Sequence, residues 1–247
     1  DSAEMIGTYF PESRLIRNTR NLLFCKAYNQ GIDASKGSFI LCLNNDVVLH
    51  KDYLKEALLA IGLDNKIGMV SGKILRMDGV TIDSTGLFLG RNRKPIERGY
   101  DKKDNGQYEK SEYVFGVSGA CAFFKRTMLM DIKSEYGYFD ERFGMYYEDL
   151  DLCWRAQKKG WKAYYNPKAV AYHTRGGTAV IHRGARPSFN FPLLSNSLKK
   201  RYLRNRYLCM RKNDSFLGIL INLPFILWYE LKIWSYLAIR LPLTLFK

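Results

Sequence analysis

The sequence predicts an α/β fold with a doubly wound, mostly parallel sheet and a C-terminal helical extension. Apolar runs alternate with segments of helical periodicity between residues 19 and 72. One run, residues 38–43, is apolar without interruption, which is typical of a strand buried on both faces. From residue 195 onward the character changes, because a basic segment is followed by a long apolar and aromatic one.

Composition limits the classes of protein that the chain can represent. It has 247 residues, of which 47% are hydrophobic and 26% are charged, enough for one large domain and an appendage. Its five cysteines are scattered without zinc-ligand spacing, so we expect reduced core residues of a cytosolic protein. The net charge of +15 predicts a polyanionic partner: nucleic acid, anionic lipid or a phosphorylated substrate.

The elements of the first half follow from periodicity and from helix and strand ends. A capped helix is expected to end before Pro11, and residues 14–17 form a short strand. The pattern then predicts a helix over 19–35, a strand over 38–43, a helix over 51–61 and a strand over 67–72. Residues 90–111 are charged and contain glycine, so we expect a mobile loop.

The second half begins with two short strands around a turn of small residues, over 114–124. Helical spacing starts near Glu148 and ends at Gly160. Strands are expected over 162–165 and 169–172, the second ending at His173. Residues 174–186, rich in glycine and arginine, predict another flexible loop, and residues 195–213 predict a basic helix.

Three carboxylates crowd the first turn of the helix near residue 148: Glu148, Asp149 and Asp151. Acidic residues at a helix start are stabilised by the helix dipole, which is sufficient to explain them. Tyr146 and Tyr147 directly before them favour a partly buried cleft instead. In such a cleft, repulsion would raise the pKa of at least one carboxyl toward the range of a general base.

Asn44, Asn45 and Asp46 directly follow the most apolar strand. Ligands of open parallel sheets bind beyond the carboxyl ends of strands. A single carboxylate there can hold Mg²⁺ or Mn²⁺ together with substrate phosphates. An ordinary turn explains the same residues, because Asn and Asp favour turns.

Segments 139–141, 146–155 and 160–161 together resemble the acidic segment of the family 2 glycosyltransferases, especially the rhamnosyltransferase-like branch. The resemblance extends from the first residues to about residue 205. It implies the GT-A fold, in which a nucleotide-diphosphate sugar is the donor. It also implies inverting transfer of rhamnose or a similar sugar to a hydroxyl of a growing glycan or lipid-linked acceptor, in cell-surface polysaccharide synthesis.

The resemblance also assigns roles to individual residues. Asp149 would be the catalytic base, and Asp46 and His173 would bind Mg²⁺ or Mn²⁺, although a lone histidine is also explained as structural. Asn44 stands where many relatives carry an acid. Substrate binding is expected from five residues: Asn29, Asn44, Asn45, Gly119 and Glu148.

Two glycine positions of the family bear on these roles. Gly119 lies in the small-residue turn that lets a donor sugar approach the backbone, and a turn needing positive φ explains it as well. Leu23 replaces the family's usual glycine in the segment that contains Asn29. Asp151 is expected to cap and orient its helix.

The resemblance gives a domain division as well. Residues 1–190 would form the catalytic domain, N-terminally truncated, because family members open with a βαβ unit and this chain opens with Asp1-Ser2-Ala3-Glu4. Residues 191–247 would form a basic and then apolar helical tail.

The uncharged run 215–229 is shorter than the roughly 20 residues that a membrane-spanning helix needs. An in-plane amphipathic anchor with Trp228 and Trp234 at the interface fits better, and the basic helix would bind anionic headgroups. The enzyme would then be cytoplasmic and peripheral on the inner face of the membrane. A helical cap packed on the catalytic domain explains the tail almost as well.

Two other classes compete with the enzyme. A basic, aromatic-rich chain can bind nucleic acid, but no nucleic-acid motif is present and the acidic cluster would repel phosphates, so we expect no nucleic-acid partner. A catalytically inactive relative could act as a scaffold of a polysaccharide-synthesis complex.

Overall fold

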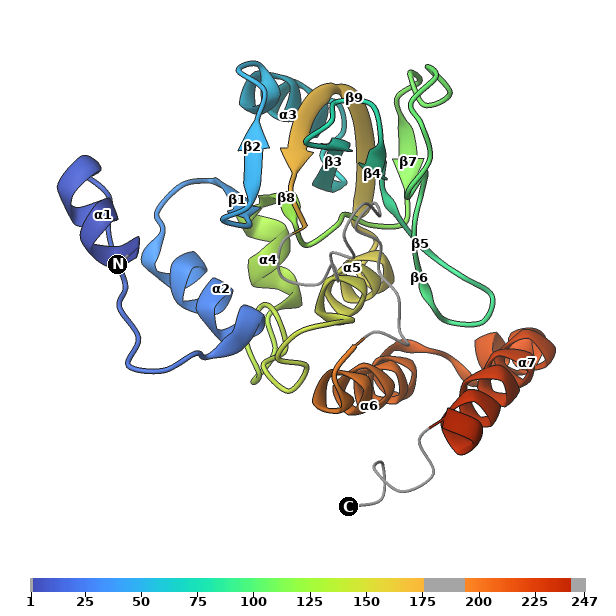
Figure 1. Ribbon diagram of the computed structural model, residues 1–247. Coiled ribbons are helices and arrows are strands. Elements are labelled where there is room, and N and C mark those ends of the chain that lie inside the picture. Colours follow the sequence, from blue (N-terminus) through green and yellow to red (C-terminus); the bar gives the residue numbers. More distant parts are fainter. Residues whose placement is uncertain (1, 176–193, 241–247) are drawn as a thin grey trace.

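The computed structural model describes residues 2–175 and 194–240, and a mixed β-sheet forms its centre (Figure 1). The strand order is β1 (Phe39–Leu43), β8 (Cys121–Lys125), β3 (Ile67–Arg76), β9 (Lys162–His173) and β2 (Val47–Leu49). Two further strands are attached to it: β4 (Ile82–Ser84) pairs with β3, and β7 (Glu112–Val114) pairs with β9. A separate hairpin consists of β5 (Leu87–Leu89) and β6 (Pro95–Glu97).

The α/β class is confirmed, but the expected mostly parallel pairing is wrong. Among the described strands, only β3 and β9 pair in parallel. Strand β8 lies between β1 and β3 and runs antiparallel to both. An apolar run indicates that a strand is buried on both faces, and central strands of mixed sheets satisfy this too. It therefore does not specify direction.

Helices cover both faces of the sheet (Figure 1). On one face, α2 (Leu23–Ala34), α4 (Arg126–Ile132) and α5 (Glu148–Lys158) share a core with Met69 and Phe124. On the other face, α3 (Tyr53–Ile61) packs with Val70 and Phe123. Neighbouring residues of β3 and of β8 thus enter opposite cores, as the two-residue period of a strand requires.

The short helix α1 (Ser2–Tyr9), α3 and α5 confirm the predicted helices, whereas three other predictions are corrected. Residues 14–17 form no strand; they are exposed and have no neighbouring strand to pair with. The helix expected from residue 19 begins at Leu23, because Leu23 has φ 64° and its N–H donates to Asn21 Oδ1 at 2.8 Å. The two strands expected after Gly160 are one strand, β9, with a register shift between Gly72 and Lys73 of its partner β3.

The segment 90–111 is not the mobile loop that we expected. It contains β6, and Arg93 within it is buried and ion-paired with Asp214. Of the second predicted loop, residues 176–186 lie outside the described part of the chain.

Two C-terminal helices complete the structure: α6 (Asn196–Asn213) and α7 (Phe216–Arg240). Ser195 caps α6 by accepting a hydrogen bond from the Leu198 N–H. The end of α6 is tied to α5, where Asn213 Nδ2 donates to Asp151 Oδ1 at 2.8 Å and Lys212 Nζ lies 3.0 Å from the same oxygen. Asp151 therefore joins two helices and does not act as the expected cap.

The last helix, α7, contacts α6 through a few side chains. Ile233 and Leu237 of α7 pack on Leu203 of α6, and Arg206 of α6 forms an ion pair with Glu230 at 2.8 Å. Among the described residues, one stretch, Phe216–Ile239, is long and apolar enough to cross a membrane by length and composition. The uncharged run 215–229 alone was expected to be too short to span a membrane. The helix is longer than this run, because it continues through Glu230 and Lys232.

Candidate active site

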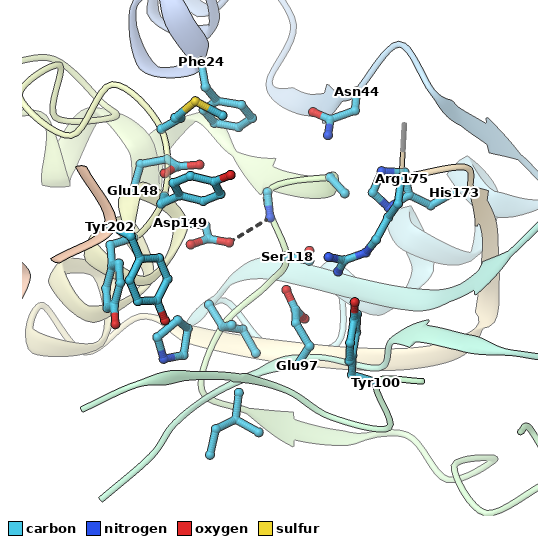
Figure 2. Close-up of a pocket in the computed structure, with 18 of the residues that line it drawn as sticks. Phe24, Asn44, Glu97, Tyr100, Ser118, Glu148, Asp149, His173, Arg175 and Tyr202 are labelled. Carbon is cyan, nitrogen blue, oxygen red and sulfur yellow. Dashed lines mark hydrogen bonds between the residues drawn. The ribbon is translucent and has the colours of Figure 1, made fainter. Parts of the chain in front are cut away.

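A pocket of about 440 Å³ opens where four parts of the fold meet (Figure 2). These parts are the start of α5, the end of β9, the turn before β8 and the β5–β6 hairpin. Helix α6 adds one wall residue, Tyr202. The lining includes most of the predicted site residues: Asn44, Gly119, Glu148, Asp149 and His173. It also includes residues that were not predicted as site residues, among them Lys94, Glu97, Tyr100, Tyr146, Tyr147, Arg175 and Tyr202.

The start of α5 is set by a strained turn. Tyr146 and Tyr147 have φ of 71° and 70°, a left-handed conformation that is uncommon outside glycine. The buried side chain of Asn205, on α6, holds this turn, because its Nδ2 lies 2.8–2.9 Å from the carbonyl oxygens of Phe143, Met145 and Tyr146. Strain of this kind persists where the surroundings fix the backbone, and it is frequent at functional sites.

Asp149 is the predicted base, and its carboxylate lies in the pocket wall. One oxygen, Oδ1, accepts the Leu150 N–H at 2.7 Å, and the other, Oδ2, accepts the Gly119 N–H at 3.3 Å. Burial raises the pKa of Asp149, although these two backbone hydrogen bonds partly oppose the rise. A carboxyl with a raised pKa is a stronger base than an exposed one once it has lost its proton.

The neighbouring Glu148 has a different environment. It is 7% exposed, and its Oε2 has no hydrogen-bond partner among the described residues. Burial, and then the charge of Asp149, raise the pKa of Glu148 well above its usual value. Each of the two carboxyls thus disfavours the charged form of the other, and Glu148 in its protonated form can donate a hydrogen bond to a ligand.

The small-residue turn fits closely against α5. A Cβ at Gly119 would come 3.5 Å from Asp149 Cβ and 3.3 Å from Phe24 Cζ. A Cβ at Gly116 would come 2.5 Å from Cys153 Sγ. Neither glycine has positive φ, so the explanation by a turn that needs positive φ is wrong. Gly116 therefore needs glycine for close approach, whereas a Cβ at Gly119 would require only a small shift of the Phe24 ring.

Asp46 and His173, 127 positions apart by number, meet opposite α5. His173 Nε2 lies 3.2 Å from Asp46 Oδ1. Figure 2 shows Asn44, His173 and Arg175 on one side of the pocket and Glu148 and Asp149 on the other. The ends of β1 and β9 bring the pair together, since β2, which follows Asp46, pairs with the end of β9.

The donor set of this pair fits a divalent cation. Two ligand atoms at right angles, each about 2.1 Å from an octahedral ion, lie about 3.0 Å apart. The Oδ1–Nε2 distance of 3.2 Å is close to this value. The described residues contain no group of three or more His, Cys, Asp or Glu that could hold a metal. A cation here would therefore need water or substrate oxygens as its other ligands.

The remaining predicted residues have separate positions. Asn29 is buried outside the pocket lining; its Nδ2 donates to the Phe139 carbonyl at 2.8 Å and its Oδ1 accepts the Phe139 N–H at 3.0 Å. This side chain orders the segment before α5. Asn45 is exposed and, with Asn44, borders a second groove of about 600 Å³ between α2 and β1.

The hairpin supplies pocket residues that sequence reasoning missed. Glu97 of β6 faces into the pocket near Tyr100 (Figure 2). Burial, and then the charge of Asp149, raise the pKa of Glu97 to about 7, against a hydrogen bond from Ser84. A usable signal existed, because apolar residues 87–89 and Ile96 flank a short glycine-containing segment, which is a hairpin pattern.

Comparison with solved structures identifies the fold class. GalNAc-T7, solved with UDP, GalNAc and Mn²⁺, matches with a TM-score of 0.55 at 13% identity, over 82% of this chain and 37% of that chain. Mannosyltransferase PcManGT from Pyrobaculum calidifontis, solved with GDP-Man and Mn²⁺, matches with a TM-score of 0.50 at 14% identity, over 97% and 67%. The fold is that of the GT-A glycosyltransferases.

The sequence profile described as "Glycosyltransferase like family 2" matches residues 1–188, so the chain belongs to that family. The amylovoran biosynthesis glycosyltransferase AmsB of Erwinia amylovora is 32% identical over 166 residues, which cover 64% of this chain and 49% of the relative. The poly-beta-1,6-N-acetyl-D-glucosamine synthase of Staphylococcus aureus is 25% identical over 150 residues, 59% of this chain and 32% of the relative. The chain thus spans half or less of the length of these relatives.

Proposed function

We propose that this chain transfers a hexose or deoxyhexose such as rhamnose, with inversion, from a nucleotide-diphosphate donor to a glycan hydroxyl. The observation that carries the proposal is that Asp149 and His173 line one pocket from opposite sides, with Asp46 Oδ1 3.2 Å from His173 Nε2. This arrangement leaves room for a sugar between a base and a site for a diphosphate. The names of AmsB and the Staphylococcus aureus synthase support polysaccharide or surface-glycan synthesis as the setting.

Helix α5 supplies the residues that act on the acceptor. Asp149 removes the proton of the acceptor hydroxyl while the hydroxyl oxygen attacks the anomeric carbon of the donor sugar. The bond between that carbon and the diphosphate breaks at the same time. The Gly119 N–H orients Oδ2 of this carboxylate. Glu148, with its raised pKa and its unpartnered oxygen, donates or accepts a hydrogen bond that positions the sugar. A positioned base contributes about 10²- to 10⁴-fold to such a reaction.

The opposite side of the pocket supplies the residues that act on the leaving diphosphate. Asp46 and His173 would hold Mg²⁺ or Mn²⁺, which when bound neutralises charge on the departing diphosphate. Arg175, whose guanidinium is in the same wall, adds a fixed positive charge. Asn44 lies between the two pockets and can hydrogen-bond the donor, whereas Asn45 is placed to do so only from the second groove. The role of Asn29 is then to fix the pocket wall through Phe139.

We also propose that α7 lies in the plane of a membrane surface. The exposed apolar side chains of α7 include Phe216, Leu220, Ile221, Trp228 and Leu231, each more than half exposed. Helix α6 contacts α7 through Leu203 and Arg206 and is charged, so a spanning α7 would draw charges of α6 toward hydrocarbon. An in-plane α7 avoids this and leaves α6 on the protein side. The enzyme would then act at the inner face of the cell membrane, on a lipid-linked or membrane-bound glycan.

The division into residues 1–190 and 191–247 needs refinement under this proposal. Helix α6 contributes Tyr202 to the pocket and holds the turn before Asp149 through Asn205, so it serves the catalytic unit. The membrane role then rests on α7 alone.

A screen of nucleotide sugars for slow donor hydrolysis tests the function. The full chain, incubated with Mn²⁺ and each donor in turn, should release nucleoside diphosphate from one donor class. The same assay on Asp149→Asn controls for contaminating activity, because that change removes the proposed base. Absence of turnover, with nucleotide binding retained, would favour the inactive scaffold.

A further inference from the structure

A buried carboxylate that plays no part in the mechanism above lies directly behind the pocket wall. Asp83, in the middle of β4, is fully buried. Its neighbours in the fold place it against the end of β9, because β4 and β9 flank the same end of β3. Burying an isolated carboxylate costs desolvation free energy, so the groups that pair with Asp83 indicate its role.

The two oxygens of Asp83 contact different side chains. Oδ2 accepts a hydrogen bond from His173 Nδ1 at 2.8 Å. Oδ1 accepts one from Arg175 Nε and lies 3.2 Å from Arg76 Nε. Of these three partners, His173 and Arg175 both line the pocket, whereas Arg76 does not.

The contact with His173 determines which ring nitrogen faces the pocket. When Asp83 accepts a hydrogen bond from Nδ1–H, the lone pair of the neutral ring is on Nε2, the atom that lies 3.2 Å from Asp46. Histidines that ligate metals generally donate their other N–H to a carboxylate or carbonyl, which fixes the ring and increases its basicity.

We propose that Asp83 is a positioning residue that aims both His173 Nε2 and the Arg175 guanidinium at one cation–diphosphate site. The inference rests on the proposed function, since it needs Asp46 and His173 to bind a divalent cation. One buried carboxylate thereby orients a metal ligand with one oxygen and a phosphate-facing cation with the other. The β4 strand, which contributes nothing to the pocket lining, becomes part of the donor site.

A purely structural role predicts something different. Asp83 could simply neutralise Arg76, which also contacts it. In that case its loss would lower the stability of the fold without a specific effect on cation affinity. The two roles are separated by measuring Mn²⁺ binding on folded protein.

The first experiment titrates Mn²⁺ alone into the full chain and follows free Mn²⁺ by electron paramagnetic resonance. Asp83→Asn should bind Mn²⁺ about 10- to 100-fold more weakly than wild type, the usual loss when the carboxylate behind a metal-ligating histidine is removed. The matched control is Asp140→Asn, which removes another fully buried carboxylate, paired with Arg142 and Lys212 away from the cation site. It should leave Mn²⁺ affinity unchanged.

The variant His173→Ala separates failure of this inference from failure of the proposed function. Equal Mn²⁺ binding by wild type and His173→Ala, or none by either, would refute the cation site itself. Loss of binding in His173→Ala with full binding in Asp83→Asn would refute only the positioning role of Asp83.

A second measurement covers the case in which Asp83→Asn does not fold. The chain has three histidines, so ¹⁵N-histidine labelling gives a simple spectrum, and His173→Ala identifies the signal of His173. In wild-type protein without metal, the neutral form of the ring should carry its proton on Nδ1. A neutral His173 ring with its proton on Nε2 would overturn the proposal.

Discussion

At the scale of single residues, Asp149 combines two properties that rarely occur together in an exposed carboxylate. It is oriented by two backbone N–H groups, and burial raises its pKa. The two hydrogen bonds fix the orientation of the carboxylate, and the raised pKa increases its affinity for a proton.

Asp149→Asn should fold and bind nucleotide as wild type does, while sugar transfer falls by about 10²- to 10⁴-fold. An amide has nearly the same shape but cannot accept the proton. Transfer and donor hydrolysis by the purified variant, with nucleotide affinity measured in parallel, check this. Glu135→Gln, a change at an exposed acid outside the pocket, serves as control. Turnover near the wild-type rate in Asp149→Asn would refute the assignment of the base.

Glu97 should make the stability of the protein depend on pH. Its pKa is about 7 in the folded protein, against 4.5 for an ordinary glutamate. Between these values the folded chain holds a proton that the unfolded chain has released. The stabilisation is therefore complete below about pH 4.5 and is lost as the pH rises through about 7.

Glu97→Gln removes this titration. Between about pH 5 and pH 8, wild type should lose roughly 1–3 kcal/mol more stability than the variant, because one unit of pKa corresponds to about 1.4 kcal/mol. Thermal or urea unfolding at both pH values measures the difference. An identical pH dependence in wild type and Glu97→Gln would contradict the buried, protonated state of this side chain.

At the scale of elements, helix α6 determines the shape of the base's surroundings although it lies far away in sequence. Asn205→Ala removes the side-chain donor of three carbonyl groups of the turn before Asp149, one in a buried and two in partly buried hydrogen bonds. The expected loss is about 1–3 kcal/mol of stability, the usual effect of leaving buried polar groups unsatisfied. Transfer should also fall, because the strained turn loses its restraint.

Unfolding and turnover of Asn205→Ala, measured together, check this prediction. Asn196→Ala changes an exposed asparagine of the same helix and should affect neither quantity. If Asn205→Ala retained full turnover, the turn would be held by something other than α6.

The sequence predicted those elements whose residues carry a period or a recognisable end. Helix α5 begins at the acidic cluster as expected, and β1 ends directly before Asn44. The direction of β8 was missed, because its pairing depends on distant parts of the chain. The β5–β6 hairpin was missed although apolar residues on both sides of a glycine-containing segment gave a local signal for it. The left-handed φ of Leu23 has no signal in the residue itself, although the family's glycine marks the position.

The candidate site was predicted in the same uneven way. Asp46, His173 and Asp149 came from their resemblance to a family; the fold places His173 and Asp149 in the lining of one pocket and Asp46 in contact with His173. Glu97 and Tyr100 lie in a segment without periodicity, so the sequence did not indicate that their side chains point into the pocket. Asn29 matched a motif, but its buried hydrogen bonds to Phe139 depend on a contact across more than a hundred residues.

At the scale of the whole molecule, α7 carries many exposed large apolar side chains. It lies at the side of the fold away from α3 (Figure 1). The full chain should bind vesicles that contain anionic lipid, and salt should weaken the binding, because the chain carries a net charge of +15. Co-sedimentation measures this binding.

The double variant Leu220→Lys with Leu231→Lys should reduce vesicle binding by placing two charges on the exposed face of α7. Leu59→Lys, an equally exposed leucine on α3, is the matched control and should bind as wild type does. Equal binding by the double variant and wild type would place the membrane contact outside α7, and no binding by wild type would rule the contact out.

The bonds between α5 and α6 also decide which part of the chain can be exchanged between relatives. A hybrid that takes its catalytic unit from this protein and its C-terminal part from another, joined near residue 190, would lose Tyr202, Asn205 and Asn213 at once. Joined after Asn213 instead, it would keep all three and exchange only α7. The interchangeable unit of this chain thus ends with α6, and recombination between relatives is expected to succeed at that boundary.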